Sequence, residues 1–113
     1  MNVENFREGI IALFETIEKY YGSKTEITQG LFSELDNLDT NLTAWNLSEF
    51  DLERSAYRTS GNKFMFEGKG TYYEISAERI IGFKQTGRNK YQFIEQYGDT
   101  VFRITKLRFH YNY

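Results

Sequence analysis

Acidic side chains recur between residues 34 and 53, within a stretch from Thr25 to Glu53 that contains no lysine or arginine. Carboxylates spaced along a rigid surface can occupy a basic groove that otherwise binds nucleic acid, because they carry the same charge as phosphates. We therefore predict an acidic surface that binds a protein partner with a basic groove. The residues of this predicted surface are Glu34, Asp36, Asp39, Glu49, Asp51 and Glu53.

The rest of the chain carries the opposite charge. Residues 1–53 have 3 basic and 11 acidic side chains, whereas residues 54–113 have 11 basic and 5 acidic ones. Basic groups track phosphates and exposed tyrosines stack on bases, so a basic aromatic sheet predicts single-stranded nucleic-acid binding as the alternative function. A simpler interpretation is that the two halves attract each other in the fold. The residues of the predicted basic surface are Arg88, Lys90, Arg103, Lys106, Arg108, Tyr111 and Tyr113.

A third pattern has the minimal elements of a metal-dependent nuclease. Asp51 and Glu67 would hold the metal, and Lys69 would stabilise the developing charge. The spacing Glu49-x-Asp51-x-Glu53 also places oxygen ligands on one strand face, although a solvated face is the simpler interpretation. Lys69 lies between two glycines, which favours a turn. We therefore expect no metal, no cofactor and no enzymatic activity.

Length and composition predict a single domain spanning residues 1–113. The chain has 113 residues, of which 40% are hydrophobic and 18% aromatic, so it can bury a core without covalent staples. It contains no cysteine, which excludes disulfides and suits a reducing cytosol. No apolar run is long enough to span a membrane. We expect a cytoplasmic protein with no membrane partner.

Two amphipathic patterns predict a helical pair within residues 1–40. The first extends from Val3 to Tyr21, and Gly22 supplies the left-handed residue that often follows a helix. The second extends from Thr25 to Asp39. An alternative makes Thr25–Thr28 a short strand and begins the helix near Leu31. The apolar positions of the second pattern are Ile27, Leu31, Leu35, Leu38 and Leu42.

After residue 43 the apolar period changes from 3.6 to 2, which predicts strands. Turn residues divide residues 43–113 into a meander of about five antiparallel strands, with a break near Ala77. Phe102 and Ile104 have one parity while Leu107 and Phe109 have the other, so a bulge near Thr105-Lys106 is expected. The predicted fold is α+β, with two helices packed on one face of the sheet.

The favoured function follows from charge separation, many tyrosines and the lack of an active-site motif. Tyrosine is enriched at protein interfaces. A small, acidic, cysteine-free domain is typical of an inhibitor encoded by a phage or mobile element. We therefore predict a non-enzymatic, anti-CRISPR-like inhibitor that mimics nucleic acid and binds a nuclease or CRISPR effector.

Overall fold

The N-terminal amphipathic pattern forms a helix, as predicted. The computed structural model describes residues 6–33 and 44–111. Helix α1 (Arg7–Thr16) continues into the 3-10 turn η2 (Ile17–Tyr20), and Gly22 follows with φ 89°. The positive φ of Gly22 confirms the expected left-handed residue after the helix. The predicted first turn from Val3 lies outside the described residues.

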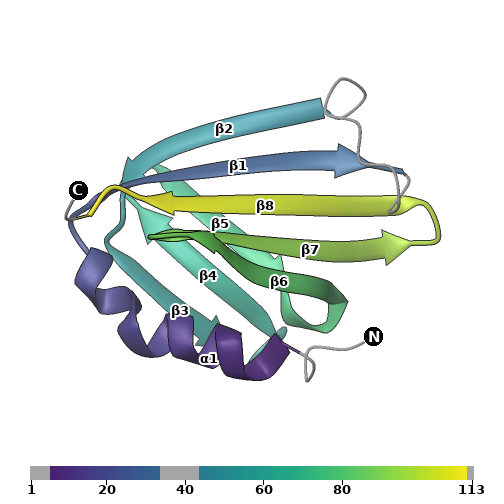
Figure 1. Ribbon diagram of the computed structural model, residues 1–113, viewed down its shortest axis with the longest axis horizontal. Coiled ribbons are helices and arrows are strands. Elements are labelled where there is room, and N and C mark those ends of the chain that lie inside the picture. Colours follow the sequence, from purple (N-terminus) through teal and green to yellow (C-terminus); the bar gives the residue numbers. More distant parts are fainter. Residues whose placement is uncertain (1–5, 34–43, 112–113) are drawn as a thin grey trace.

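Within the described residues, strands β1 to β8 form two antiparallel sheets (Figure 1). The larger has five strands in the order β2-β1-β8-β7-β6, and the smaller has three in the order β3-β4-β5. The α+β class is therefore confirmed, while the single meander is wrong. The strands are β1 (Lys24–Phe32), β2 (Ala44–Asp51), β3 (Arg54–Arg58), β4 (Lys63–Gly68), β5 (Thr71–Ser76), β6 (Ile80–Gly87), β7 (Lys90–Gly98) and β8 (Val101–Phe109).

The chain passes between the two sheets at two short breaks. Leu52 and Glu53 separate β2 from β3, and the 3-10 turn η3 (Ala77–Arg79) separates β5 from β6. The break expected near Ala77 is therefore confirmed. Because the chain changes direction at both places, β3, β4 and β5 form a second layer, and the chain returns to the larger sheet with β6.

The helix predicted from Thr25 to Asp39 is wrong over residues 25–32, which belong to β1. The alternative strand at Thr25–Thr28 is confirmed, while the helix that this alternative begins near Leu31 is wrong at residues 31–32. Strand β1 pairs with β2 on one side and β8 on the other. Thr25 and Ile27 are buried and alternate with less buried residues, which is the period of a strand. Leu31 follows with the same parity but is 54% exposed. The later leucines of the helical pattern lie outside the described residues.

The bulge expected near Thr105-Lys106 is also wrong. β8 pairs with β1 without interruption from Phe102 to Phe109. Phe102 and Ile104 are buried on one face of β8, and Leu107 and Phe109 are buried on the other, so the change of apolar parity requires no extra residue. Leu107 and Phe109 belong to the main core, whereas Phe102 faces the other side and stacks on Phe32 with ring centroids 5.4 Å apart.

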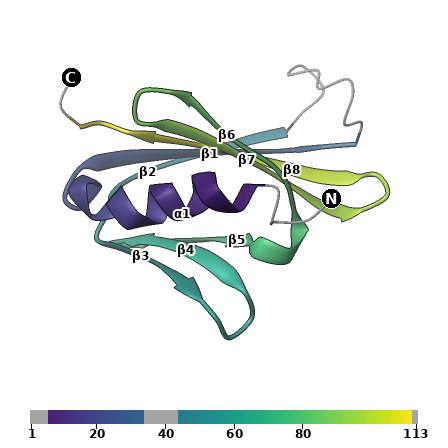
Figure 2. The same ribbon diagram turned by 60° about the horizontal axis from the view of Figure 1, so that its bottom comes forward.

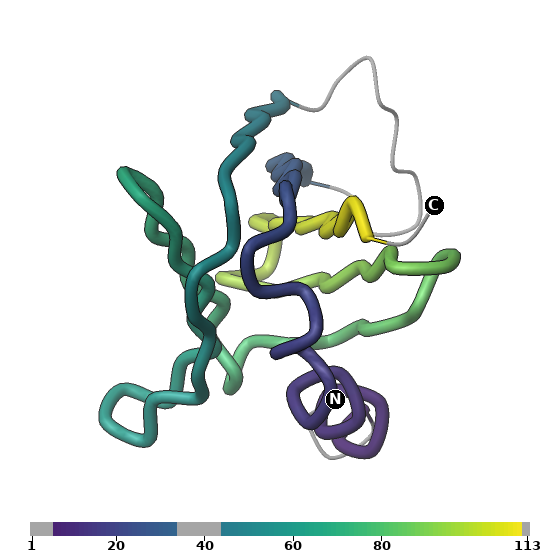
Figure 3. Tube along the Cα trace, turned by 90° about the vertical axis from the view of Figure 1, so that its left-hand side faces the viewer, coloured from purple at the N-terminus to yellow at the C-terminus, as the bar shows by residue number. Residues whose placement is uncertain are grey.

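Helix α1 lies between the two sheets (Figure 2). Seen end-on, it borders β6 on one side and faces the smaller sheet on the other (Figure 3). Gly9 permits close contact with β6, because a Cβ atom there would lie 2.8 Å from the Phe83 ring. At the other end of the helical segment, Tyr20 stacks on Phe109 with ring centroids 4.0 Å apart. Packing against β6 therefore leaves the opposite side of α1 facing β3.

Candidate binding groove between α1 and β3

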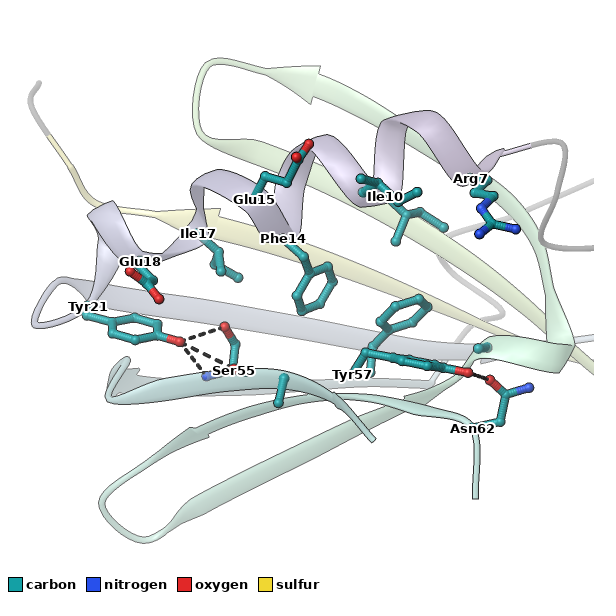
Figure 4. Close-up of a pocket in the computed structure, with 14 residues that line it drawn as sticks. Arg7, Ile10, Phe14, Glu15, Ile17, Glu18, Tyr21, Ser55, Tyr57 and Asn62 are labelled. Carbon is teal, nitrogen blue, oxygen red and sulfur yellow. Dashed lines mark hydrogen bonds between the residues drawn. The ribbon is translucent and has the colours of Figure 1, made fainter. Parts of the chain in front are cut away.

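A groove of about 520 Å³ lies between α1 and the smaller sheet (Figure 4). Its wall on the helix side includes Ile10, Phe14 and Ile17, and its opposite wall includes Tyr57 and Phe64. Ligand sites in proteins are mostly concave and apolar, with volumes of about 300–1,000 Å³. The groove has the size and lining of such a site.

The apolar face of α1 builds the helical wall. Ile10 and Ile17 are seven residues apart, so both project from one side of the helix, and each is only 2% exposed. Phe14 lies between them and stacks on Phe64 with ring centroids 5.0 Å apart. Phe14 is only partly buried, and the neighbouring Ile11 is 44% exposed. The groove is therefore open to solvent along the helix.

Polar groups mark the two ends of the groove. At one end, the Tyr21 hydroxyl accepts a hydrogen bond of 2.9 Å from the Ser55 backbone N–H. At the other, the Tyr57 hydroxyl donates to the Asn62 side-chain oxygen. Glu18 lies at the Tyr21 end and Arg7 at the Asn62 end (Figure 4). The groove thus carries a negative charge at one end and a positive charge at the other, with a second acid, Glu15, on the helix between them.

A second cluster of polar groups lies between the two sheets. The Glu95 side chain is fully buried, and its carboxylate lies 2.7 Å from the Arg103 guanidinium. The Tyr97 hydroxyl donates to the same carboxylate. Burial and this hydrogen bond raise the pKa of Tyr97 to about 12. The Ser76 N–H also donates to Glu95, so this buried acid is held by several partners and serves the packing of the sheets.

The predicted acidic surface falls partly on the described residues. Glu49 lies on β2 and forms an ion pair of 2.8 Å with Lys24, which lowers the pKa of Glu49 through a hydrogen bond and charge attraction. Asp51 and Glu53 are exposed where the chain leaves the larger sheet. Glu34, Asp36 and Asp39 lie outside the described residues.

The predicted basic residues divide between two faces of the larger sheet. Lys90 and Arg108 lie directly opposite each other on β7 and β8. Lys106 lies on the same face, with its ammonium 5.1 Å from the centre of the Trp45 ring. Arg103 faces the other way and pairs with Glu95 in the interior.

The remaining predicted nucleic-acid contacts lie elsewhere. Arg88 is in the turn between β6 and β7. Tyr111 packs edge-on against Tyr20, with ring centroids 5.4 Å apart. Tyr113 lies outside the described residues. The predicted set is therefore not gathered into one surface.

The residues of the nuclease pattern have structural neighbours. Glu67 accepts a hydrogen bond of 2.7 Å from Arg54 on the adjacent strand. Lys69 lies in the turn between β4 and β5, as its flanking glycines suggest. Across residues 6–33 and 44–111, no three acidic or histidine side chains are grouped so that they could hold a metal ion.

No pattern in the sequence indicates the groove. Phe14 and Phe64 have the spacing of ordinary core residues, which they partly are. Ser55 and Tyr57 carry no distinguishing signal, because an exposed tyrosine on a short strand is common. Only the position of β3 beside α1 brings these residues together.

Comparison of the chain with protein-family models, curated proteins and solved structures finds no match. In the described part of the chain, neither the length nor the apolarity of any helix suffices to cross a membrane. The chemistry of the groove and of the sheet faces is therefore the basis for a functional proposal.

Proposed function

We propose that this chain is a non-enzymatic binding protein that holds an apolar segment of a protein partner in the groove between α1 and β3. The supporting observation is an open groove with Phe14, Tyr57 and Phe64 in its walls. Such aromatic groups gain free energy when a ligand removes them from water, at about 25 cal/mol per Å² of apolar surface. Aromatic anchors of this kind dominate many protein interfaces.

The proposal is tested by selecting peptides from a random dodecapeptide library displayed on phage. Ile11→Asp places a charge on the exposed rim of the groove and should abolish binding of the selected peptides. Ala12→Asp is the matched control, because Ala12 is exposed on the same helix but borders the hollow beside β6 instead. Failure to enrich any peptide that distinguishes these two variants would refute the proposal.

The identity of the partner remains a separate proposal. An inhibitor of a nuclease or CRISPR effector would be expected to use the acidic surface, of which Asp51 and Glu53 are exposed. Neutralising both, as Asp51→Asn and Glu53→Gln, should then weaken binding to a basic enzyme. If the groove is the binding surface, the same double variant should bind the selected peptides as the wild type does.

Nucleic-acid binding is a second candidate function, favoured by the pair Lys90 and Arg108. Lys90 lies directly opposite Arg108, and Arg108 also forms an ion pair of 3.9 Å with Glu26 on β1. A phosphate beside Lys90 and Arg108 would add a second negative charge to this group of cations. Anisotropy titrations with labelled single-stranded DNA and RNA at low salt test this candidate. Lys90→Gln should weaken binding, whereas Lys69→Gln, in an exposed turn of the other sheet, should not. Equal affinities of the Lys90→Gln variant and the wild type for these strands would contradict this candidate.

A further inference from the structure

The edge of β3 that faces away from β4 carries backbone groups in an unusual arrangement. On this side, none of the described strands pairs with β3. The Ser55 N–H donates to the Tyr21 hydroxyl at 2.9 Å, and the same hydroxyl lies 3.3 Å from the Ser55 carbonyl oxygen. One tyrosine side chain therefore contacts both backbone groups that a neighbouring strand would contact.

The alternation of an antiparallel ladder locates the next set of edge groups. Ser55 is paired with Phe66, and its N–H points away from β4. In such a ladder, the residue two positions along has the same orientation. The N–H and C=O of Tyr57 therefore also point away from β4, at the side of the groove.

The dimensions of the groove match a short extended segment. α1 and η2 together span residues 7–20, which corresponds to a length of about 21 Å. β3 has five residues, or about 17 Å of strand. A segment of about five residues could therefore lie along β3 with alternate side chains directed into the groove.

Charge at the two ends of the groove favours one orientation of such a segment. Glu18 lies at the end of the groove that holds Ser55, where β3 begins, and Arg7 lies at the end that holds Asn62, on the opposite wall (Figure 4). Among the described residues, none forms an ion pair or a hydrogen bond with the Arg7 side chain. A bound segment with an acidic end at Arg7 and a basic end at Glu18 would complement both charges.

We infer that the groove receives its partner as an added β-strand, paired with the edge of β3 at Tyr57, beyond the position that Tyr21 occupies, and covered by α1. This inference rests on the proposed function and specifies the mode of binding. The occupant is an extended segment of a protein with apolar residues at alternate positions. Antiparallel pairing is slightly stronger than parallel pairing, so the acidic end of the segment is its N-terminal end. Backbone hydrogen bonds supply affinity, and the groove selects the side chains.

The test uses a capped heptapeptide, acetyl-Glu-Val-Thr-Val-Thr-Val-Lys-amide, titrated against the isotopically labelled protein. Binding should slow hydrogen exchange of the Tyr57 amide by about tenfold or more, because a strand hydrogen bond protects an amide from solvent. Exchange of the Lys69 amide, in the exposed turn, should not change. The peptide with Glu and Lys interchanged should bind more weakly.

Two N-methylated peptides separate strand pairing from side-chain contact alone. N-methylation of the central valine or of the adjacent threonine should weaken binding at one of these positions only, because alternate amides of a strand face the partner.

The outcomes distinguish this inference from the proposed function. Peptide binding with unchanged Tyr57 exchange, or equal effects of the two N-methyl groups, would overturn strand addition while leaving the groove as a binding site. The same conclusion follows if the heptapeptide does not bind but library selection yields groove-dependent peptides. If neither binds, both proposals are wrong.

Discussion

The carboxylate of Glu95 and the guanidinium of Arg103, 2.7 Å apart, together complete the edge of β5. The carboxylate accepts the Ser76 N–H at 2.8 Å, and the guanidinium donates to the Glu74 carbonyl oxygen at 2.7 Å. Both side chains belong to the larger sheet, whereas both backbone groups belong to the smaller one. This ion pair therefore links the two layers by the hydrogen-bonding pattern of a missing strand.

Replacement of Arg103 should destabilise the fold strongly. Arg103→Met leaves the buried Glu95 carboxylate without its cation, and breaking a buried pair in this way costs about 3–5 kcal/mol. The free energy of unfolding from urea titration checks this value. Arg108→Met is the control, because Arg108 lies on the same strand but is exposed on the opposite face. Equal stability of the two variants would contradict the structural role of Arg103.

Removal of both charges should restore only part of the lost stability. Glu95→Leu combined with Arg103→Met leaves no unpaired charge in the interior. Replacement of a buried ion pair by apolar side chains often changes the stability of a protein very little. Here the Ser76 N–H and Glu74 C=O would lose their partners, at about 1–3 kcal/mol for each group left buried and unsatisfied. Urea unfolding of the double variant should therefore give a stability between those of Arg103→Met and the wild type. Full recovery would mean that the edge of β5 needs no partner.

Alkaline pH should destabilise the protein through Tyr97. Its pKa rises from the ordinary value of 10.0 to about 12 in the folded state. Between these values the unfolded chain loses the phenolic proton while the folded chain keeps it, so stability falls as pH rises through this window. Tyr97→Phe should reduce the loss of melting temperature between pH 9 and pH 12. An identical pH dependence in the variant would contradict this role of Tyr97.

Truncation of Phe14 should remove the aromatic wall of the groove. Phe14→Ala should cost about 3 kcal/mol, the lower end of the range for a buried phenylalanine, because the ring is only partly buried. Thermal melts measure the effect, with Ile11→Ala as a control on the exposed side of the same helix. A melting temperature within a degree or two of the wild type would show that α1 is not docked through this ring.

Gly68 should not tolerate even a methyl group. A Cβ atom there would lie 2.3 Å from the Asp51 carbonyl oxygen and 2.5 Å from the Phe50 ring. Gly68→Ala should therefore cost about 1–3 kcal/mol through overpacking where the two sheets meet. Gly98→Ala is the matched control, because its Cβ would meet no atom within 4 Å. Similar urea midpoints for the two variants would contradict this prediction.

The helix and strands that the apolar pattern predicts correctly are elements that bury one face of their own side chains. Ile10, Leu13 and Ile17 mark the helix, while Phe64 and Phe66 mark a strand, because each set packs on one face of its own element. The interpretation of residues 25–31 as a helix fails because widely spaced apolar residues fit both periods. The pairing that makes this segment a strand comes from β8, far along the chain.

The binding groove depends on relationships that no local pattern records. Tyr21 and Ser55 are 34 residues apart, and nothing in either neighbourhood indicates that the tyrosine hydroxyl contacts the edge of β3. The interior position of Arg103 is likewise set by Glu95 on the adjacent strand, although its sequence context is that of a surface cation. Prediction of such contacts requires the order of the strands, which the apolar pattern does not specify.

The pairing of β1 with β8 also constrains how the protein can be made. Thr25 lies opposite Phe109 and Phe32 lies opposite Phe102, so the two partners in each pair are separated by most of the chain in sequence. During synthesis, β1 leaves the ribosome long before β8, so the edge of β1 that β8 pairs with stays open in the meantime. An open edge is a template for association with other chains, and such distant pairing slows folding. The nascent chain is therefore most vulnerable to aggregation in the interval before residues 101–109 emerge.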